Sequence, residues 1–410
     1  MPSSLTLHLL NNTTTPHVWA YITGLSLPSN RRILLTSTGD PYSPPSPSSI
    51  LQPLPISVSI PLGPPGTLTP LTLPQIAGGR IWFSVHKQLT FLLNPGGPAG
   101  SAALVEPSVL NPSDPNADVD FSFCEFTLNN DQLFANISYV DFVPRLPIAL
   151  TLQRVNGEVQ HVSGMGADGL ERVCEGLRAQ SERDGMPWDK LILMGKEDGK
   201  PLRVLAPTHG GAVGAGFEGY FEPLVERAWE RYRGGGGGRR FGGLLHGHGH
   251  RHGEANGGGM LRINTQAGPG VVDGRVDGEE LVVGGEKFCK PTTADILGCN
   301  SGPFTTGPSL VRNAIIPRLA AAFQRGCICD VAEHPSQPQT FYKCEGGPTN
   351  HYSRIVHECN LDGKGYAFAY DDVQPDGGED QSGKVNAGDP KVFIVAVGGV
   401  GAYVGDRMPY

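Results

Sequence analysis

The sequence predicts a mainly β protein into which a mixed α/β segment is inserted. Glycine (57) and proline (36) together exceed a fifth of the 410 residues, so turns are frequent and long helical arrays or coiled coils are excluded. In the N-terminal part, short apolar runs alternate with turn signals about every 8–12 residues, which is typical of a β-sandwich or barrel. The middle of the chain instead shows helical periodicity.

The N-terminal part reads as short strands punctuated by proline. Its first hundred residues hold only five formal charges, and proline-rich turns lie at 41–47 and 63–66. Strands are expected at 5–10, 18–25, 33–37, 56–60, 80–85, 89–93, 119–128, 133–143 and 148–155.

The middle part mixes helices with strands. Apolar residues recur at helical spacing in three segments, and a proline inside the last of them, Pro317, is expected to kink or divide that helix. Pro308 suits a first-turn position. Helices are expected at 168–183, 219–232 and 308–325, and further strands at 190–194, 366–370 and 392–397.

These elements predict two domains. Residues 1–152 and 351–410 are expected to form one discontinuous β domain, and residues 153–350 a mixed α/β domain. A glycine-rich segment at 233–259 carries alternating histidines from His246 to His252. Histidines can bind metal, but glycine supplies no rigid frame for ligands, so a disordered insertion is the favoured interpretation.

Cysteines and sequons point outside the cell, although the N-terminus lacks the features of a signal peptide. Six of the eight cysteines lie between Cys289 and Cys359, and an even, clustered count predicts disulfides. Metal binding is the alternative, but no Cys-x-x-Cys pair supplies the usual zinc geometry. Three Asn-x-Ser/Thr sequons, at Asn11, Asn12 and Asn136, favour secretion weakly.

Charge and local motifs exclude several functions. A net charge of −8 argues against a nucleic-acid partner, and no apolar run is long enough to span a membrane. The glycine motif at 214–219 lacks the strand before it and the acid after it that a dinucleotide site needs. No G-x-S-x-G, H-E-x-x-H or Walker sequence occurs. A neutral polar ligand fits this composition best.

Two carboxylates, Glu125 and Asp141, occupy otherwise apolar predicted strands, where acids are disfavoured. A long loop centred on Leu133 would place them face to face. A tight turn at 129–130 would instead separate them by about five residues, or about 16 Å along the ladder. They can equally be solvated positions on a polar sheet face. Facing carboxylates are what glycoside hydrolysis requires, and the surrounding amides, hydroxyls and aromatic rings suit a carbohydrate cleft or a lectin-like binder.

Several motifs closely resemble glycoside hydrolase family 64, the endo-β-1,3-glucanases with a thaumatin-like domain, which include the laminaripentaose-producing enzymes. The resemblance covers nearly the whole chain apart from the glycine/histidine segment. The opening strand, 10–20, looks like the first strand of a thaumatin-like sandwich. The other matching motifs are 104–108, 111–114, 123–127, 133–141, 290–295, 299–304, 321–325 and 366–373.

The resemblance implies a thaumatin-like β-sandwich or barrel and a mixed α/β domain flanking a wide groove. It further implies an inverting mechanism in which Glu125 is the general acid and Asp141 the general base. Phe134 stands where some members have Trp, which would weaken stacking but leave the chemistry intact. The positions that would line the subsites are Thr127, Asn129, Phe134 and Ser138.

The sequence thus predicts an inverting endo-β-1,3-glucanase that releases short laminari-oligosaccharides. Apolar neighbours such as Phe123 and Phe126 are expected to raise the pKa of the Glu125 acid. The expected partner is β-1,3-glucan, with no metal or organic cofactor, no nucleic acid and no membrane, and a monomer is the default. Two alternatives stay open: a non-catalytic thaumatin-like glucan-binding protein, which would need neither acid, and a structural wall protein.

Overall fold

The computed structural model describes residues 4–233, 259–266, 268–343 and 347–399, and its chain divides into two compact units. The first unit comprises residues 1–216, 351–372 and 380–410. The second comprises residues 217–350 and 373–379. Of the expected insertion at 233–259, residues 234–258 lie outside the described residues. Within the described part of the chain, no helix has the length and apolarity needed to cross a membrane.

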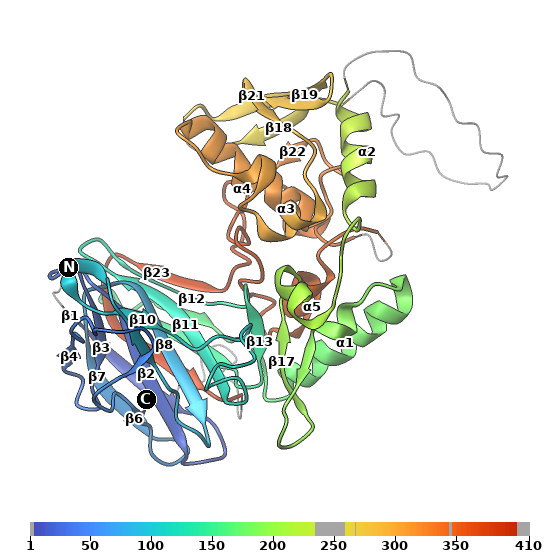
Figure 1. Ribbon diagram of the computed structural model, residues 1–410. Helices are drawn as coiled ribbons and strands as arrows, with labels where there is room; N and C mark the ends of the chain where they lie inside the picture. Colours follow the sequence, from blue (N-terminus) through green and yellow to red (C-terminus); the bar gives the residue numbers. More distant parts are fainter. Residues whose placement is uncertain (1–3, 234–258, 267, 344–346, 400–410) are drawn as a thin grey trace. The chain divides into compact units, whose positions relative to one another are not determined.

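Two sheets form the body of the first unit (Figure 1). The smaller one has the order β15 (Val159–Val162), β14 (Ile148–Arg154), β24 (Pro390–Val397), β1 (Ser4–Asn11) and β7 (Leu68–Pro74). In the larger one the order is β23 (Lys384–Ala387), β12 (Leu133–Ile137), β11 (Asp120–Leu128), β8 (Ile76–Val85), β2 (Val18–Ser26), β3 (Arg31–Leu35) and β4 (Pro41–Tyr42), with β6 (Ile60–Pro61) beside β2.

Two short sheets and two helices complete the first unit. The short sheets are β10 (Ala103–Val105), β9 (Leu92–Asn94) and β5 (Gln52–Pro53), and β13 (Phe142–Pro144), β17 (Pro201–Leu205) and β16 (Ile192–Met194). Helix α1 (Gly169–Asp184) packs on α5 (His351–Cys359) through an apolar stripe that includes Leu170, Val173 and Leu177. The helix ends at Gly185, whose positive φ of 73° suits glycine.

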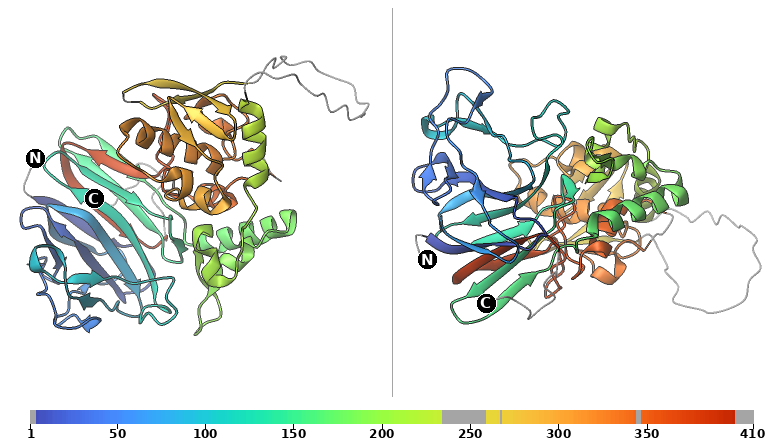
Figure 2. Two further views of the ribbon diagram at one scale, coloured as in Figure 1. Left: turned by 45° about the horizontal axis from the view of Figure 1, so that its top comes forward. Right: turned by 90° about the horizontal axis from the view of Figure 1, so that it is seen from below.

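The second unit is a five-stranded sheet with helices packed on it. The strand order is β21 (Glu286–Phe288), β20 (Glu280–Val283), β19 (Val271–Asp277), β18 (Leu261–Asn264) and β22 (Glu333–His334). Figures 1 and 2 show α3 (Thr293–Gly298) and α4 (Leu310–Gln324) against one face of this sheet, while α2 (Glu222–Tyr232) contacts β19.

The observed elements differ from the expected ones in identifiable places. Residues 153–216 belong to the first unit, not to the second domain, because β15 pairs with β14 and β17 pairs with β13. The expected strand 133–143 is split into β12 and β13, and the expected strand 366–370 is reduced to a bridge at Tyr366. Helix α4 runs through Pro317 without dividing, and its N-cap is Ser309, which lies after Pro308.

The structure contradicts the expected disulfides and buries two of the three sequons. The structure describes seven of the eight cysteines and places no disulfide among them. Cys344 lies outside the described residues. The described cysteines are spread over separate places in the fold: Cys124 is buried in a sheet, whereas Cys174 and Cys359 lie on packed helices. The sequon residues Asn11 and Asn136 are buried, so neither amide is accessible to a glycan in the folded chain.

Candidate active site

The candidate acid Glu125 lies on β11 where one face of the sheet changes character. Alternating side chains place Phe121, Phe123, Glu125 and Thr127 on that face. The two phenylalanines are buried in an aromatic cluster with Trp82. Glu125 and Thr127 are half-buried. The polar part of the face therefore begins immediately beside a rigid aromatic core.

A row of polar side chains crosses five strands at this level. Thr23 lies opposite Arg80, Arg80 opposite Glu125, Glu125 opposite Asn136, and Asn136 opposite Lys384. Directly opposed residues of antiparallel strands project from the same face. The pairing register of β2, β8, β11, β12 and β23 thus brings together residues that are far apart in the sequence.

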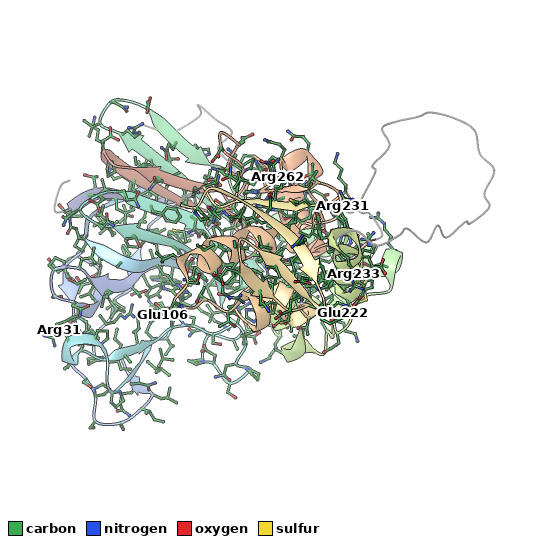
Figure 3. All side chains as sticks on the ribbon, turned by 90° about the horizontal axis from the view of Figure 1, so that it is seen from above. Arg31, Glu106, Glu222, Arg231, Arg233 and Arg262 are labelled. Atoms are coloured by element: carbon green, nitrogen blue, oxygen red, sulfur yellow. The ribbon has the colours of Figure 1, made fainter. Side chains whose placement is uncertain are left out.

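Arg80 is the centre of this row. Its Nε and Nη2 both donate to Oε1 of Glu125 at 3.2 Å, and its Nη1 donates to Oε2 of Glu106 at 2.8 Å. Glu106, labelled in Figure 3, follows directly after β10. The guanidinium carbon lies 4.8 Å from the ring centroid of Phe123 and 5.5 Å from that of Trp82, which are cation–π contacts. One cation therefore joins two carboxylates above the aromatic core.

The environment of Glu125 differs from the apolar one expected from the sequence. Its side chain is 37% exposed and pairs with a cation. The ring of Phe126 lies on the opposite face of the strand, against Gly79. Of these two expected neighbours, Phe123 shares the face of Glu125, and Arg80 covers its ring. Arg80 is bound through Oε1, so Oε2 of Glu125 makes no hydrogen bond to the described residues.

The candidate base Asp141 lies where the chain leaves the large sheet. After β12 ends at Ile137, Ser138 makes a bridge to Tyr366, and β13 then joins a different sheet. The backbone carbonyl of Asp141 accepts a hydrogen bond from Ala206 N at 2.9 Å. This bond fixes Asp141 beside the segment that continues from β17 into a short 3₁₀ helix (Pro207–Val213).

His209, within that 3₁₀ helix, holds the Asp141 side chain. The distance from His209 Nε2 to Asp141 Oδ1 is 3.1 Å. A carboxylate can only accept, so Nε2 donates. This hydrogen bond is the main cause that lowers the pKa of Asp141, and the charges of His209 and Arg80 act in the same direction against partial burial. Asp141 is therefore ionised at neutral pH.

The turn between β11 and β12 decides the spacing of the two acids along the ladder. Asn129 Oδ1 accepts from the backbone N–H groups of Asp131 and Gln132, and Leu128 pairs with Leu133. The turn is therefore tight, and Glu125 lies opposite Asn136, five residues before Asp141. The value of about 16 Å for a continuous ladder does not apply, because β12 ends at Ile137. Arg80 hydrogen-bonds Glu125, and its charge is a lesser cause that lowers the pKa of Asp141.

An open pocket of about 420 Å³ lies over this part of the sheet. Thr127 and Phe134, which oppose each other across β11 and β12, line it together with Glu125. Asn129 instead holds the turn, and Ser138 pairs with Tyr366. The remaining lining residues are Arg32, Gly78, Gly79, Arg80, Glu106, Phe126 and Asn136.

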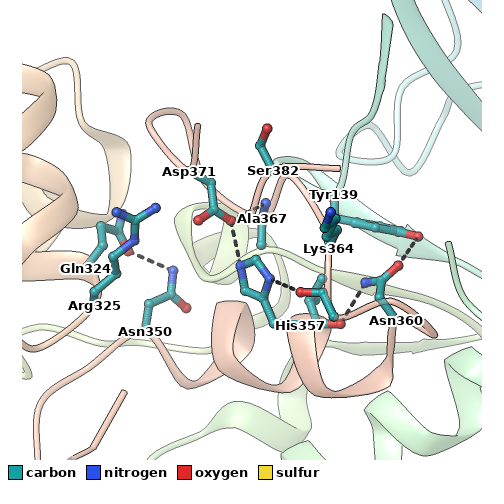
Figure 4. A network of polar contacts seen from close by, with 12 residues as sticks. Tyr139, Gln324, Arg325, Asn350, His357, Asn360, Lys364, Ala367, Asp371 and Ser382 are labelled. Atoms are coloured by element: carbon teal, nitrogen blue, oxygen red, sulfur yellow. Dashed lines mark hydrogen bonds and ion pairs between the residues drawn. The ribbon is translucent and has the colours of Figure 1, made fainter. Parts of the chain in front are cut away.

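A loop after α5 carries Tyr366, which pairs with Ser138 just after β12. His357 of α5 contacts this loop, through Nε2 to Asp371 Oδ2 and through Nδ1 to the Gly363 carbonyl, both at 2.9 Å (Figure 4). Asp371 Oδ2 also accepts from Ala367 N at 3.0 Å. The pKa of the Tyr366 phenol is raised chiefly by burial, with the charge of Glu125 among the lesser causes. The loop is thus fixed by buried polar contacts, and it lies close enough to the site for the charge of Glu125 to act on Tyr366.

Three residues of the site were missed by sequence reasoning: Arg80, Glu106 and His209. Arg80 carried a usable signal, because it is one of five charges in the first hundred residues and lies in an apolar strand. Glu106 lies in the motif 104–108, but nothing in the local sequence distinguishes it as a site residue. His209 had no local signal. Among the described residues, no group of three or more His, Cys, Asp and Glu side chains is arranged to hold a metal ion.

Comparison with known proteins gives consistent matches. A family model described as Beta-1,3-glucanase (Glyco_hydro_64) matches residues 3–236 and 257–397. The chain is 29% identical over 314 residues to a glucan endo-1,3-beta-glucosidase of Cellulosimicrobium cellulans, covering 74% of this chain and 50% of that protein. It therefore spans about half the length of the curated relatives that it matches.

Solved structures show the same similarity. A laminaripentaose-producing beta-1,3-glucanase, solved in complex with laminaritetraose, superposes with a TM-score of 0.79 at 29% identity, over 97% of this chain and 99% of that one. A beta-1,3-glucanase domain from Clostridium beijerinckii gives a TM-score of 0.69 at 23% identity, over 97% and 98% of the two chains. At 23% identity, the similarity to the second structure supports the fold alone.

Proposed function

This chain belongs to glycoside hydrolase family 64, the β-1,3-glucanases, and we propose that it is an endo-acting β-1,3-glucan hydrolase that inverts the anomeric carbon. The observation that carries the proposal is a pair of carboxylates in contrasting environments: Glu125 is hydrogen-bonded by Arg80, and Asp141 by His209. One of them, Asp141, is held ionised by His209. The other, Glu125, keeps one oxygen open towards a polar pocket.

The proposed reaction is a single displacement. Asp141 takes a proton from a water molecule, and the water oxygen attacks the anomeric carbon. As the new C–O bond forms, the glycosidic C–O bond breaks, and Glu125 donates its proton to the leaving oxygen. Glu125 ends ionised and Asp141 ends protonated, and exchange with solvent restores both. Room for the water requires carboxyl groups about 6.5–9.5 Å apart.

The environments of the two acids support this division of roles. A base must be ionised before the reaction begins, and the lowered pKa of Asp141 meets that condition at neutral pH. An acid must present a protonated oxygen to the leaving group. Oε2 of Glu125 makes no hydrogen bond to the described residues, whereas Oε1 is bound to Arg80, so Oε2 is the oxygen proposed to carry the proton.

Substrate binding is proposed for the pocket beside Glu125. Phe134 offers a flat face to a sugar ring, and Thr127 offers a hydroxyl. Asn136 adds a buried Oδ1 that accepts no hydrogen bond from the described residues. Asn129 and Ser138 complete the set implied by the family resemblance. Short laminari-oligosaccharides are the proposed products.

Further proposals concern the fold of the first unit, the groove, the location of the protein and its oligomeric state. We propose a thaumatin-like identity for the first unit, in accord with its two packed sheets, and a wide groove as the family resemblance implies. Action on extracellular glucan by a secreted monomer also remains a proposal. Its support is the family, since the cysteine and sequon arguments are weakened by the structure.

The experiment that tests the function measures cleavage and binding separately. Wild type, Glu125→Gln and Asp141→Asn are compared for new reducing ends from a linear β-1,3-glucan and for binding of the same glucan. The expected result is hydrolysis by wild type and binding without hydrolysis by both variants. If wild type binds the glucan but produces no reducing ends, the chain is a binding protein and the proposal fails.

A further inference from the structure

The Arg80 guanidinium is divided between two carboxylates in an unequal way. Its shortest hydrogen bond, 2.8 Å, goes to Glu106, and the two 3.2 Å bonds to Glu125 share a single oxygen. A bidentate Arg–carboxylate pair would use both oxygens of one acid. The geometry therefore makes Glu106 the main partner of Arg80 and leaves Glu125 the weaker one.

Glu106 is itself anchored in the interior of the first unit. Its Oε1 accepts from the Thr23 hydroxyl at 2.7 Å, and that hydroxyl accepts from Trp82 Nε1 at 3.2 Å. Thr23 is fully buried, and Trp82 belongs to the aromatic cluster over which Arg80 lies. The Glu106 side chain is 23% exposed, compared with 37% for Glu125. Glu106 is therefore the fixed acid of the pair.

The charges of this group determine where a proton is tolerated. With both acids ionised, the charge of Glu106, Arg80 and Glu125 together is −1, and a proton on Glu125 makes it zero. Without the Glu106 charge, the same proton would leave a net +1 and would cost Arg80 its ionic partner. Opposite charges within a few ångströms favour the ionised form of an acid. Glu106 therefore counteracts the effect that Arg80 alone would have on Glu125.

Other charged groups face Glu125 from neighbouring elements. Arg32 of β3 lines the same pocket, and Lys384 of β23 lies in the same row, where it pairs with Asp380. Tyr366, on the loop after α5, feels the charge of Glu125. Arg80 also acts on Asp141. Among the described residues, the ion pairs of Arg80 go to Glu106 and Glu125.

We infer that Glu106 is a positioning residue: by holding Arg80 as its main ionic partner, it keeps Glu125 able to carry the proton that the reaction consumes. The inference rests on the proposed function, in which Glu125 is the general acid. Glu106 also lines the pocket, but its proposed effect on the acid is exerted through Arg80.

The test is the pH dependence of kcat/KM on a linear β-1,3-glucan, whose alkaline limb reports the ionisation of the general acid. In Glu106→Gln, Arg80 has only Glu125 as partner, so the alkaline limb should move to lower pH by about one unit. In Arg80→Met the limb should move to higher pH by about one unit or more. Opposite shifts from two contacting residues are not produced by general loss of structure.

A double variant separates action through Arg80 from a direct charge effect. In the Arg80→Met background, most of the shift caused by Glu106→Gln should disappear. Glu106→Asp keeps the charge on a side chain one methylene shorter, so it should shift the alkaline limb by a smaller amount. This variant replaces Glu106→Gln in the test if Glu106→Gln does not fold. Glu197→Gln, which removes an exposed acid paired with Lys87 beyond the end of β8, should leave the limb in place.

The inference is overturned by an alkaline limb that stays in place in Glu106→Gln and Glu106→Asp. It is equally overturned by a Glu106→Gln shift of the same size with and without Arg80, because the effect would then be direct. The proposed function fails separately, if wild type does not hydrolyse the glucan at any pH.

Discussion

Replacing His209 by alanine removes the hydrogen bond that holds the candidate base Asp141 ionised. The bond spans 3.1 Å, and it is the largest cause that lowers the pKa of Asp141. A hydrogen bond to a charged group contributes about 1.5–3 kcal/mol, which corresponds to about one to two pH units at 1.36 kcal/mol per unit. The Asp141 side chain is 46% exposed, so water replaces part of the lost bond and the lower end applies.

The assay is the acidic limb of the kcat/KM profile on a soluble β-1,3-glucan. The base must be ionised, so activity falls as the pH drops through the Asp141 pKa. Without His209 this pKa rises, and the acidic limb should move to higher pH by about one unit. His209→Gln can still present an amide N–H, so a smaller shift is expected.

The control removes an imidazole elsewhere in the first unit. His8 lies on β1, in the smaller sheet, and His8→Gln should leave the limb unchanged. The reasoning is refuted if the acidic limb of His209→Ala coincides with that of wild type, because Asp141 would then not be the ionisation that the limb reports.

Three further predictions concern the packing and binding around the site and the second unit. Burial lowers the pKa of His334 from 6.5 to about 4, so the unfolded state gains its proton first and the free energy of unfolding falls by about 3 kcal/mol between pH 7 and 4. The unfolding free energy of His334→Gln, measured by urea denaturation at several pH values, should lack this part of the pH dependence. The same pH dependence in wild type and variant would contradict the assignment. A Cβ at Gly79 would lie 2.4 Å from Phe126 Cζ, so Gly79→Ala should reduce the unfolding free energy by about 1–3 kcal/mol, and unchanged stability would show that the ring moves aside freely. Phe134→Ala should raise KM about tenfold with a smaller effect on kcat, whereas a loss in kcat alone would exclude stacking as its role.

The strands and helices were predictable where one periodicity dominated. The alternation of β11 and the apolar stripe of α1 follow directly from the sequence. The split of the expected strand 133–143 was not visible, because it depends on Ser138 pairing with Tyr366, far away in the chain. The assignment of residues 153–216 to the first unit likewise depends on strand pairings that no local pattern specifies.

The site was predictable in its acids and not in the partners of those acids. Glu125 and Asp141 stand out as charges in apolar segments of the sequence, whereas the role of Arg80 requires the register that opposes it to Glu125. That register joins β11 to β8, which lie far apart in the sequence, whereas the tight turn closed by Asn129, one of two turns that the sequence allowed, sets the pairing of β11 with β12. His209 reaches Asp141 only because Ala206 bonds to the Asp141 backbone. Such contacts are tertiary and have no local signature.

The central claim is tested most directly by following the anomer of the new reducing end by NMR as wild type cleaves a linear β-1,3-glucan. An inverting enzyme with Glu125 as acid and Asp141 as base releases the α-anomer first, and Glu125→Gln and Asp141→Asn release almost none. If the β-anomer appears first, the reaction retains configuration and the assignment of Asp141 as a base acting on water is wrong.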